Sequence, residues 1–147
     1  MKSLAGLIRL VNWRVDEKRR ELSGAQDVLD ARRKALADMA DELKREQAAA
    51  RASPEGAQAY ANYARQYLVR RAQAGEAILA AEAEVERVRE ELSSLFLELK
   101  QAEITQANRD KREAERLAKL EQTALDEMGI ARFQRARKAT EGGDGRS

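Results

Sequence analysis

Pairs of adjacent acidic residues are the features of this sequence that come closest to a catalytic constellation. Glu90 and Glu91 form one pair, and Asp126 and Glu127 form another. A carboxyl group acts as a general acid near neutral pH only where its surroundings raise its pKa. Both pairs lie in charged, helix-forming stretches, where we expect solvated surfaces and no cleft. The sequence therefore predicts no catalytic residues and no enzyme activity.

Other kinds of chemistry are limited by what the chain lacks. It contains no cysteine and no histidine, which removes thiolate nucleophiles, imidazole bases and the usual zinc ligands. The glycine-rich segment 142–145 lacks the preceding strand, the spacing and the following Lys-Ser/Thr of a phosphate-binding loop. We therefore expect no metal site and no cofactor.

The composition favours long helices over a thick globular core. Charged residues make up 37% of the 147 residues and aromatic residues only 4%, and there is a single proline. Such a chain can still fill a coiled-coil seam, which uses about two positions in seven. The 28 basic and 26 acidic residues are mixed along the chain. Mixed signs are typical of a solvated helix surface, and without a basic stripe or stacking aromatics we expect no nucleic-acid partner.

A heptad repeat runs through residues 4–50. Every seventh residue from Ile8 is aliphatic, which gives Ile8, Val15, Leu22, Leu29, Leu36 and Leu43. The alternate seam positions are Leu4, Val11, Lys18, Ala25, Arg32 and Met39. Six heptads in one phase exceed the three or four that indicate a coiled coil, and the two cations at seam positions are expected to set register at some cost in stability.

A turn is predicted at residues 52–56, where Ser53 can cap a new helix and Pro54 fits its first turn. The seam then continues with Tyr60, Ala64, Tyr67, Arg71, Ala74, Ile78, Ala81, Val85, Val88, Leu92, Leu95, Leu99 and Ala102. The predicted fold is all-α, an antiparallel coiled-coil hairpin in a single domain, 1–140, with helices at about 4–51 and 57–138. A tight turn places residue 4 opposite about residue 103, whereas a separate short helix over 57–74 would place it opposite about residue 123. The tail, 141–147, is expected to be disordered.

Three features offer partner-binding surfaces, each with an ordinary packing alternative. Trp13 lies off the seam, so it either packs locally or forms part of an exposed docking patch. Tyr60, Tyr63 and Tyr67 share one helical face and either fill the seam or anchor a partner. The stretch 130–138 carries four positive charges and no negative ones, which either suits a helix C-terminus or steers the chain toward an acidic protein.

The sequence resembles the FliJ proteins of the bacterial flagellar type III export apparatus. The opening, residues 4–20 (LAGLIRLVNWRVDEKRR), resembles their Leu-x-x-Leu start with its aromatic and basic residues. The aromatic group Tyr60, Asn62, Tyr63 and Tyr67 resembles the family's aromatic segment after the turn. The ending, residues 125–137 (LDEMGIARFQRAR), resembles the family's acidic pair followed by a basic amphipathic turn.

This resemblance implies a coiled-coil stalk, similar to the central subunit of rotary ATPases, that inserts into the hexameric flagellar export ATPase. It further implies contacts with the cytoplasmic part of the export gate and with export chaperones. The residues implied for ATPase binding are Arg9, Trp13, Arg132, Phe133 and Arg135. Those implied for the export gate are Tyr63, Tyr67, Arg71, Ala74 and Ile78, although Arg71 departs from the family's mostly apolar face.

The expected location is cytoplasmic and peripheral, at the inner face of the cell membrane, held there only through partners. Two alternatives remain open from the residues. The chain could be a self-assembling coiled-coil scaffold, or it could serve a virulence-type secretion system in place of a flagellar one.

Overall fold

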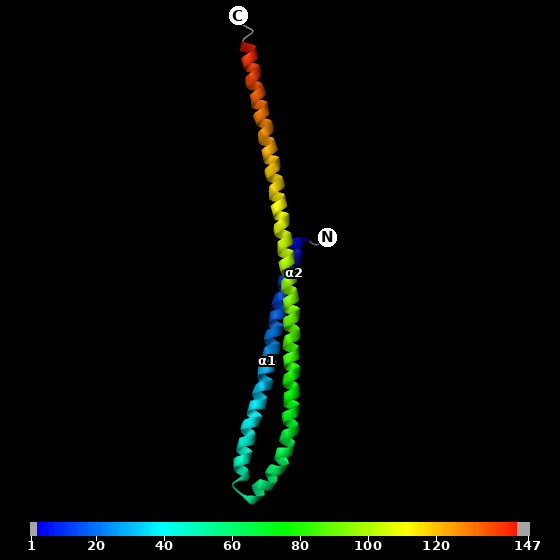
Figure 1. Cartoon of the computed structure of the whole chain (residues 1–147), viewed down its shortest axis with the longest axis vertical. Coiled ribbons are helices and arrows are strands. Elements are labelled where there is room, and N and C mark those ends of the chain that lie inside the picture. The colour runs from blue at the N-terminus through cyan, green and yellow to red at the C-terminus, as the bar shows by residue number, and fades with distance from the viewer. Residues whose placement is uncertain (1–2, 144–147) are drawn as a thin grey trace. The chain divides into compact units, whose positions relative to one another are not determined.

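The computed structural model describes residues 3–143, which form two helices, α1 (Leu4–Ala50) and α2 (Pro54–Gly143). Spatial contacts divide the chain into two units, one ending at Lys100 and one beginning at Gln101. In the first unit, α1 lies beside the first part of α2 and runs in the opposite direction (Figure 1). The predicted all-helical antiparallel hairpin is therefore confirmed.

Hydroxyl caps define where each helix begins. The Ser3 side chain accepts a hydrogen bond from the backbone N–H of Gly6 at 3.1 Å, and Ser53 does the same for Gly56 at 3.0 Å. These bonds satisfy donors that have no partner inside the first helical turn. Because Ser53 caps α2 directly, the helix begins at Pro54, and only residues 51–53 connect the helices. The expected turn extended to residue 56.

Gly56 permits this short connection. A Cβ atom built on Gly56 would lie 2.8 Å from the carbonyl oxygen of Ala49, at the end of α1. Real Cβ atoms do not approach a backbone oxygen so closely, and this backbone group cannot rotate away as a flexible side chain could. The close return of the chain therefore depends on a glycine at this position.

Two apolar clusters hold the hairpin together. Val11 and Val15 pack with Leu92, and Leu29 packs with Ala81 and Val85. The predicted seam residues of both helices are buried or half-buried, with the exception of the two arginines, Arg32 and Arg71, whose side chains are exposed. A guanidinium group buried in a two-helix seam would be left without water, so both side chains turn outward.

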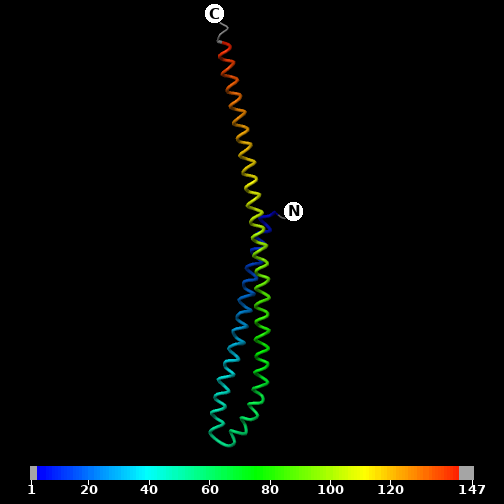
Figure 2. The backbone as a smooth tube through the Cα atoms, viewed as in Figure 1, coloured from blue at the N-terminus to red at the C-terminus, as the bar shows by residue number. Residues whose placement is uncertain are grey.

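The helices are farther apart near the turn than near the N-terminal end of α1 (Figure 2). Tyr60, Tyr63 and Tyr67 occupy this part of the seam, with neighbouring rings 6.5 Å and 6.3 Å apart. The Tyr60 hydroxyl accepts a hydrogen bond from the Gln47 side chain of α1 at 3.0 Å. The large tyrosine rings thus fill the wider space between the helices near the turn, whereas alanine and valine fill the narrower space elsewhere in the seam.

The pairing of residues between the two helices matches the register expected for a tight turn. Lys18 bonds to Glu91 and Glu21 bonds to Arg87, whereas a separate short helix after the turn would have placed residue 18 opposite about residue 109. At the other end of the sequence, α2 extends through Gly143. Residues 141–143 of the expected disordered tail are therefore helical, and residues 144–147 lie outside the described part of the chain.

Candidate functional site

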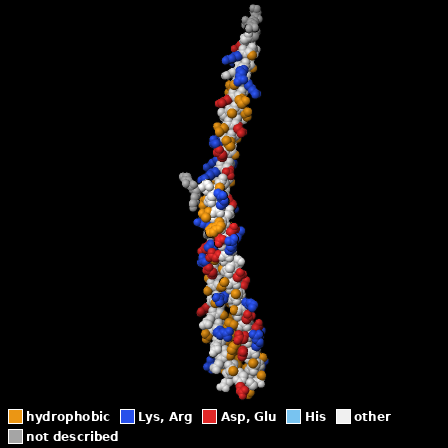
Figure 3. Space-filling model, turned by 180° about the vertical axis from the view of Figure 1, so that it is seen from behind, with side chains coloured by type: hydrophobic (Ala, Val, Ile, Leu, Met, Phe, Trp, Pro, Cys, Tyr) orange, Lys and Arg blue, Asp and Glu red, His pale blue; other side chains and the backbone are white. Residues whose placement is uncertain are grey.

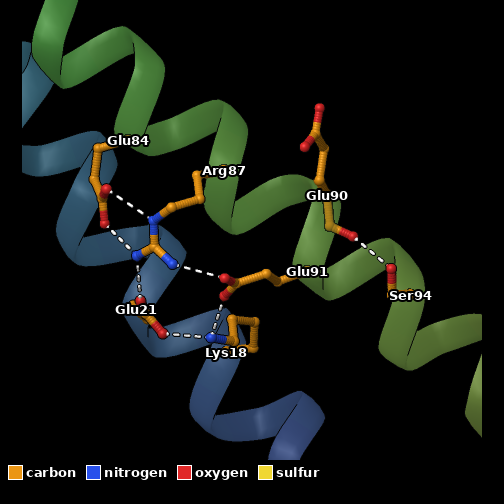
Figure 4. A network of polar contacts seen from close by, with 7 residues as sticks. All are labelled: Lys18, Glu21, Glu84, Arg87, Glu90, Glu91 and Ser94. Carbon is orange, nitrogen blue, oxygen red and sulfur yellow. Dashed lines mark hydrogen bonds and ion pairs between the residues drawn. The ribbon is translucent and has the colours of Figure 1, made fainter.

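A closed ring of charges links the two helices of the first unit (Figure 4). The Lys18 ammonium donates to Glu91 at 2.6 Å and to Glu21 at 2.8 Å. Arg87 donates to the same two carboxylates, at 2.7 Å and 3.0 Å, and also to Glu84. Each of the two shared glutamates therefore bridges two cations, and the ring crosses between the helices twice.

The ring explains how the charged side chain of a lysine is accommodated at a seam position. The Lys18 side chain runs out of the seam, and its ammonium group lies between two carboxylates at the edge. The hydrogen bond to Glu21, followed by the bond to Glu91, raises the pKa of Lys18 above its ordinary value. Hydrogen bonding to Lys18 in turn lowers the pKa of Glu91. All four groups are thus held in their charged forms, and they fix the helix register without doing acid–base chemistry.

A shallow groove lies beside this ring. Its volume is about 480 Å³, and it is lined by Trp13, Arg14, Glu17, Lys18, Glu21, Glu91, Ser94 and Leu95. Trp13 forms one wall and remains 61% exposed. Local packing therefore accounts for less than half of the Trp13 surface, which favours the docking-patch alternative over the packing one. Arg9 is also exposed.

The residues implied for the export gate mostly face the partner helix. Tyr67 is buried, while Tyr63, Ala74 and Ile78 are half-buried, and only Arg71 is exposed. Burial, with the nearby Glu42 carboxylate, raises the pKa of Tyr63. The outward face of the same segment carries Leu68, Val69 and Leu79 instead, each about 60% exposed. This face was not predicted from the sequence, because the expected contact residues were mostly seam residues, which lie one position away along the helix.

The second unit presents nearly all its side chains to solvent. Among the described residues 101–142, only Ala102 is buried, and only Gln106 and Ala131 are half-buried. The apolar residues at 48–68% exposure are Ile104, Leu117, Leu120, Leu125, Met128, Ile130 and Phe133. Figure 3 shows such hydrophobic side chains between charged ones along this part of α2. These exposed apolar side chains are available for contact with another protein.

The basic residues near the end of α2 lie beside this apolar surface. Arg132 and Arg135 are exposed, and the ion pairs formed within residues 101–143 involve neither of them. Phe133 is 68% exposed. The implied ATPase-binding residues of this segment are thus available to a partner.

Within residues 3–143, no group of three or more acidic side chains is arranged to hold a metal ion. The adjacent acids considered as catalytic candidates remain on open helix faces: Glu91 belongs to the charge ring, and Asp126 accepts a hydrogen bond from Gln122 at 2.9 Å. Both have ordinary structural partners.

Comparison with known protein families matches residues 1–138 to the family described as Flagellar FliJ protein. The match covers nearly the whole chain. This chain belongs to the FliJ family. A search of curated proteins and a search of solved structures each gave no match.

As a FliJ family member, the chain is a non-catalytic component of the flagellar type III export apparatus. The match favours the flagellar role over the virulence-type alternative. No helix in the described part of the chain has the length and apolar composition required to cross a bilayer.

Proposed function

We propose that this FliJ protein is a stalk that binds the flagellar export ATPase ring and couples it to the export gate and export chaperones. It would act in the cytoplasm, at the inner face of the membrane, through these partners. The observation that carries the proposal is the exposure of Phe133 and its apolar neighbours on a FliJ-family helix, where Arg132 and Arg135 take part in no ion pair within residues 101–143. Apolar anchors beside free guanidinium groups are typical of binding hot spots.

Charge supports the ATPase as the partner of this surface. Arg132 and Arg135 are exposed, and the stretch 130–138 has no acidic residue. A basic end of this kind is attracted to acidic loops, which raises the rate of encounter and favours one orientation. Arg9 and Trp13, at the start of α1, are the further exposed residues that we assign to this contact.

For the export gate, we propose the segment that contains Tyr63, Tyr67, Arg71, Ala74 and Ile78. Tyr63 and Tyr67 would act by holding α2 in place, because their rings pack in the seam. The contact itself would fall to Arg71 and to the exposed Leu68 and Leu79 beside it. A partner could then bind without opening the hairpin.

The decisive test is charge reversal at Arg132 and Arg135. The Arg132→Glu, Arg135→Glu double variant is titrated with the purified export ATPase of the same bacterium, and binding is measured by biolayer interferometry at low and moderate salt. We expect a loss of affinity of about tenfold or more at low salt, equivalent to ~1.4 kcal/mol, and a smaller loss at moderate salt because surface charges are screened.

The matched control reverses two exposed arginines of α1, as Arg32→Glu and Arg45→Glu, and should bind the ATPase like the wild type. Circular dichroism checks that both variants keep their helices. ATPase affinity of the Arg132/Arg135 variant within about twofold of wild type would contradict the proposal, because that variant would then have lost its charges without losing its partner.

A further inference from the structure

Two basic residues interrupt the apolar ladder of α1. Lys18 and Arg32 occupy seam positions, whereas every other seam position from Leu4 to Leu43 holds an apolar residue. A ladder of this kind can pair with a second copy of itself, because identical heptads meet layer by layer in a parallel coiled coil. The α1 helix therefore has two possible partners, which are α2 of the same chain and α1 of another copy.

Each of the two seam cations is followed directly by an arginine, which gives the pairs Lys18-Arg19 and Arg32-Arg33. In a parallel pair of α1 helices in register, the seam side chain at either position packs against the same residue of the second copy and against the residue that follows it. Lys18 would therefore meet a lysine and an arginine, and Arg32 would meet two arginines. Such layers of like charge strongly disfavour the pairing of α1 with α1.

The α2 helix instead places carboxylates opposite these cations. The Lys18 ammonium donates to Glu91 at 2.6 Å (Figure 4), and the Arg33 guanidinium donates to Glu82 at 3.3 Å. No seam position of α1 holds an acidic residue. The α2 helix thus offers the opposite charge at both places where a second α1 would offer the same charge.

The other two cations are also compatible with α2. The Arg19 guanidinium lies 5.3 Å from the centre of the Phe96 ring of α2, where the face of the ring attracts a cation. The Arg32 side chain is exposed, so the hairpin leaves this cation in water. Pairing with α2 therefore buries none of the four charges against a like charge.

From these contacts we infer that the two cation pairs of α1 determine its partner: they direct α1 to α2 of the same chain and exclude pairing with α1 of a second copy. Coiled coils use charges in and beside the seam to select partners, at some cost in stability. The cations thus keep the stalk a monomeric hairpin although α1 carries six heptads. This choice concerns the chain's own helices and does not depend on the proposed ATPase and gate contacts.

A cysteine at residue 25 reports directly on the excluded pairing. Ala25 occupies a seam position between the two cation pairs, and the chain contains no cysteine of its own. In a parallel pair of α1 helices, residue 25 of one copy lies opposite residue 25 of the other, close enough for a disulfide. In the hairpin, Ala25 packs against a cluster formed by both helices, so Ala25→Cys alone should form few disulfide-linked dimers.

The Ala25→Cys chain is compared with the same chain carrying Lys18→Leu and Arg32→Leu, which make the seam of α1 wholly apolar. Each chain is refolded from urea at several protein concentrations and oxidised, and the linked dimer is measured by non-reducing electrophoresis. We expect at least about ten times more dimer from the seam variant at the highest concentration, because both layers of like charge are removed. The matched control carries Lys34→Leu and Arg45→Leu, the same two changes at exposed positions off the seam, and should behave like Ala25→Cys alone.

Sedimentation of the chains without the cysteine gives a second measurement. The wild type should be monomeric at every concentration and the seam variant should form dimers, while circular dichroism checks that both are helical. A seam variant that stays monomeric and unlinked, or a parent or control chain that forms as much dimer, would overturn the inference. A seam variant that sediments as a dimer without the disulfide at residue 25 would also overturn it, because α1 would then have paired in another way.

Discussion

Replacing Val11 by alanine tests whether the seam between the helices holds the hairpin together. Val11 is fully buried and packs in a cluster with Val15 and Leu92. The matched control is Val28→Ala, which makes the same chemical change on the same helix at a side chain that is 50% exposed. The two variants differ in burial alone.

The cost can be worked out from three contributions. Removing two buried carbon groups from Val11 loses about 1.6 kcal/mol of transfer free energy. The cavity of roughly 50 Å³ that they leave adds about 1.2 kcal/mol. Alanine returns about 0.6 kcal/mol because it favours the helix more than valine does. The expected net loss is about 2 kcal/mol.

For Val28, half of the transfer contribution is already lost to solvent and no closed cavity forms, so its cost should be close to zero. The assay is urea unfolding followed by circular dichroism at 222 nm, with the free energy of unfolding extrapolated to water. Equal losses for the two variants, or a loss below about 0.5 kcal/mol for Val11, would refute the assigned packing between α1 and α2.

Two further predictions concern the charge ring and the turn. The carboxylate of Glu91 has a pKa below its ordinary value of 4.5 because it accepts a hydrogen bond from Lys18, so the stability that it contributes is fully present above that value and is lost as the pH falls through the lowered pKa. The melting temperature of the wild type should therefore fall as the pH is lowered below about 4.5. Glu91→Gln should make this fall shallower, and an equally steep fall in the variant would exclude the ring as a source of stability. Gly56→Ala should destabilise the protein by about 1 kcal/mol because its methyl group meets the backbone of α1, whereas Gly75→Ala, where a Cβ atom meets nothing within 4 Å, should stabilise it, as measured by urea unfolding.

The hairpin was predictable because its determinants are local and periodic. Aliphatic residues at every seventh position from Ile8 to Leu43 specify one face of a helix, and Ser53-Pro54 specifies a new start. The ends of the helices were harder to predict, because a helix continues until a residue ends it. The cap at Ser53 starts α2 at Pro54, three residues before the expected position, and no further proline follows in the sequence to end the helix before Gly143.

The partners of Lys18 could not be read from the sequence. A seam lysine predicts that the side chain turns outward, but Glu91 lies 73 residues away in sequence. Its identity as a partner depends on the length of the turn, and a shift of one helical turn would bring a different residue to the same place. The charge ring is thus a product of tertiary register, and periodicity alone does not determine it.

The gate segment shows how sensitive a surface prediction is to helical phase. Each residue turns the helix by about 100°, so a step of one residue separates buried Tyr67 from exposed Leu68.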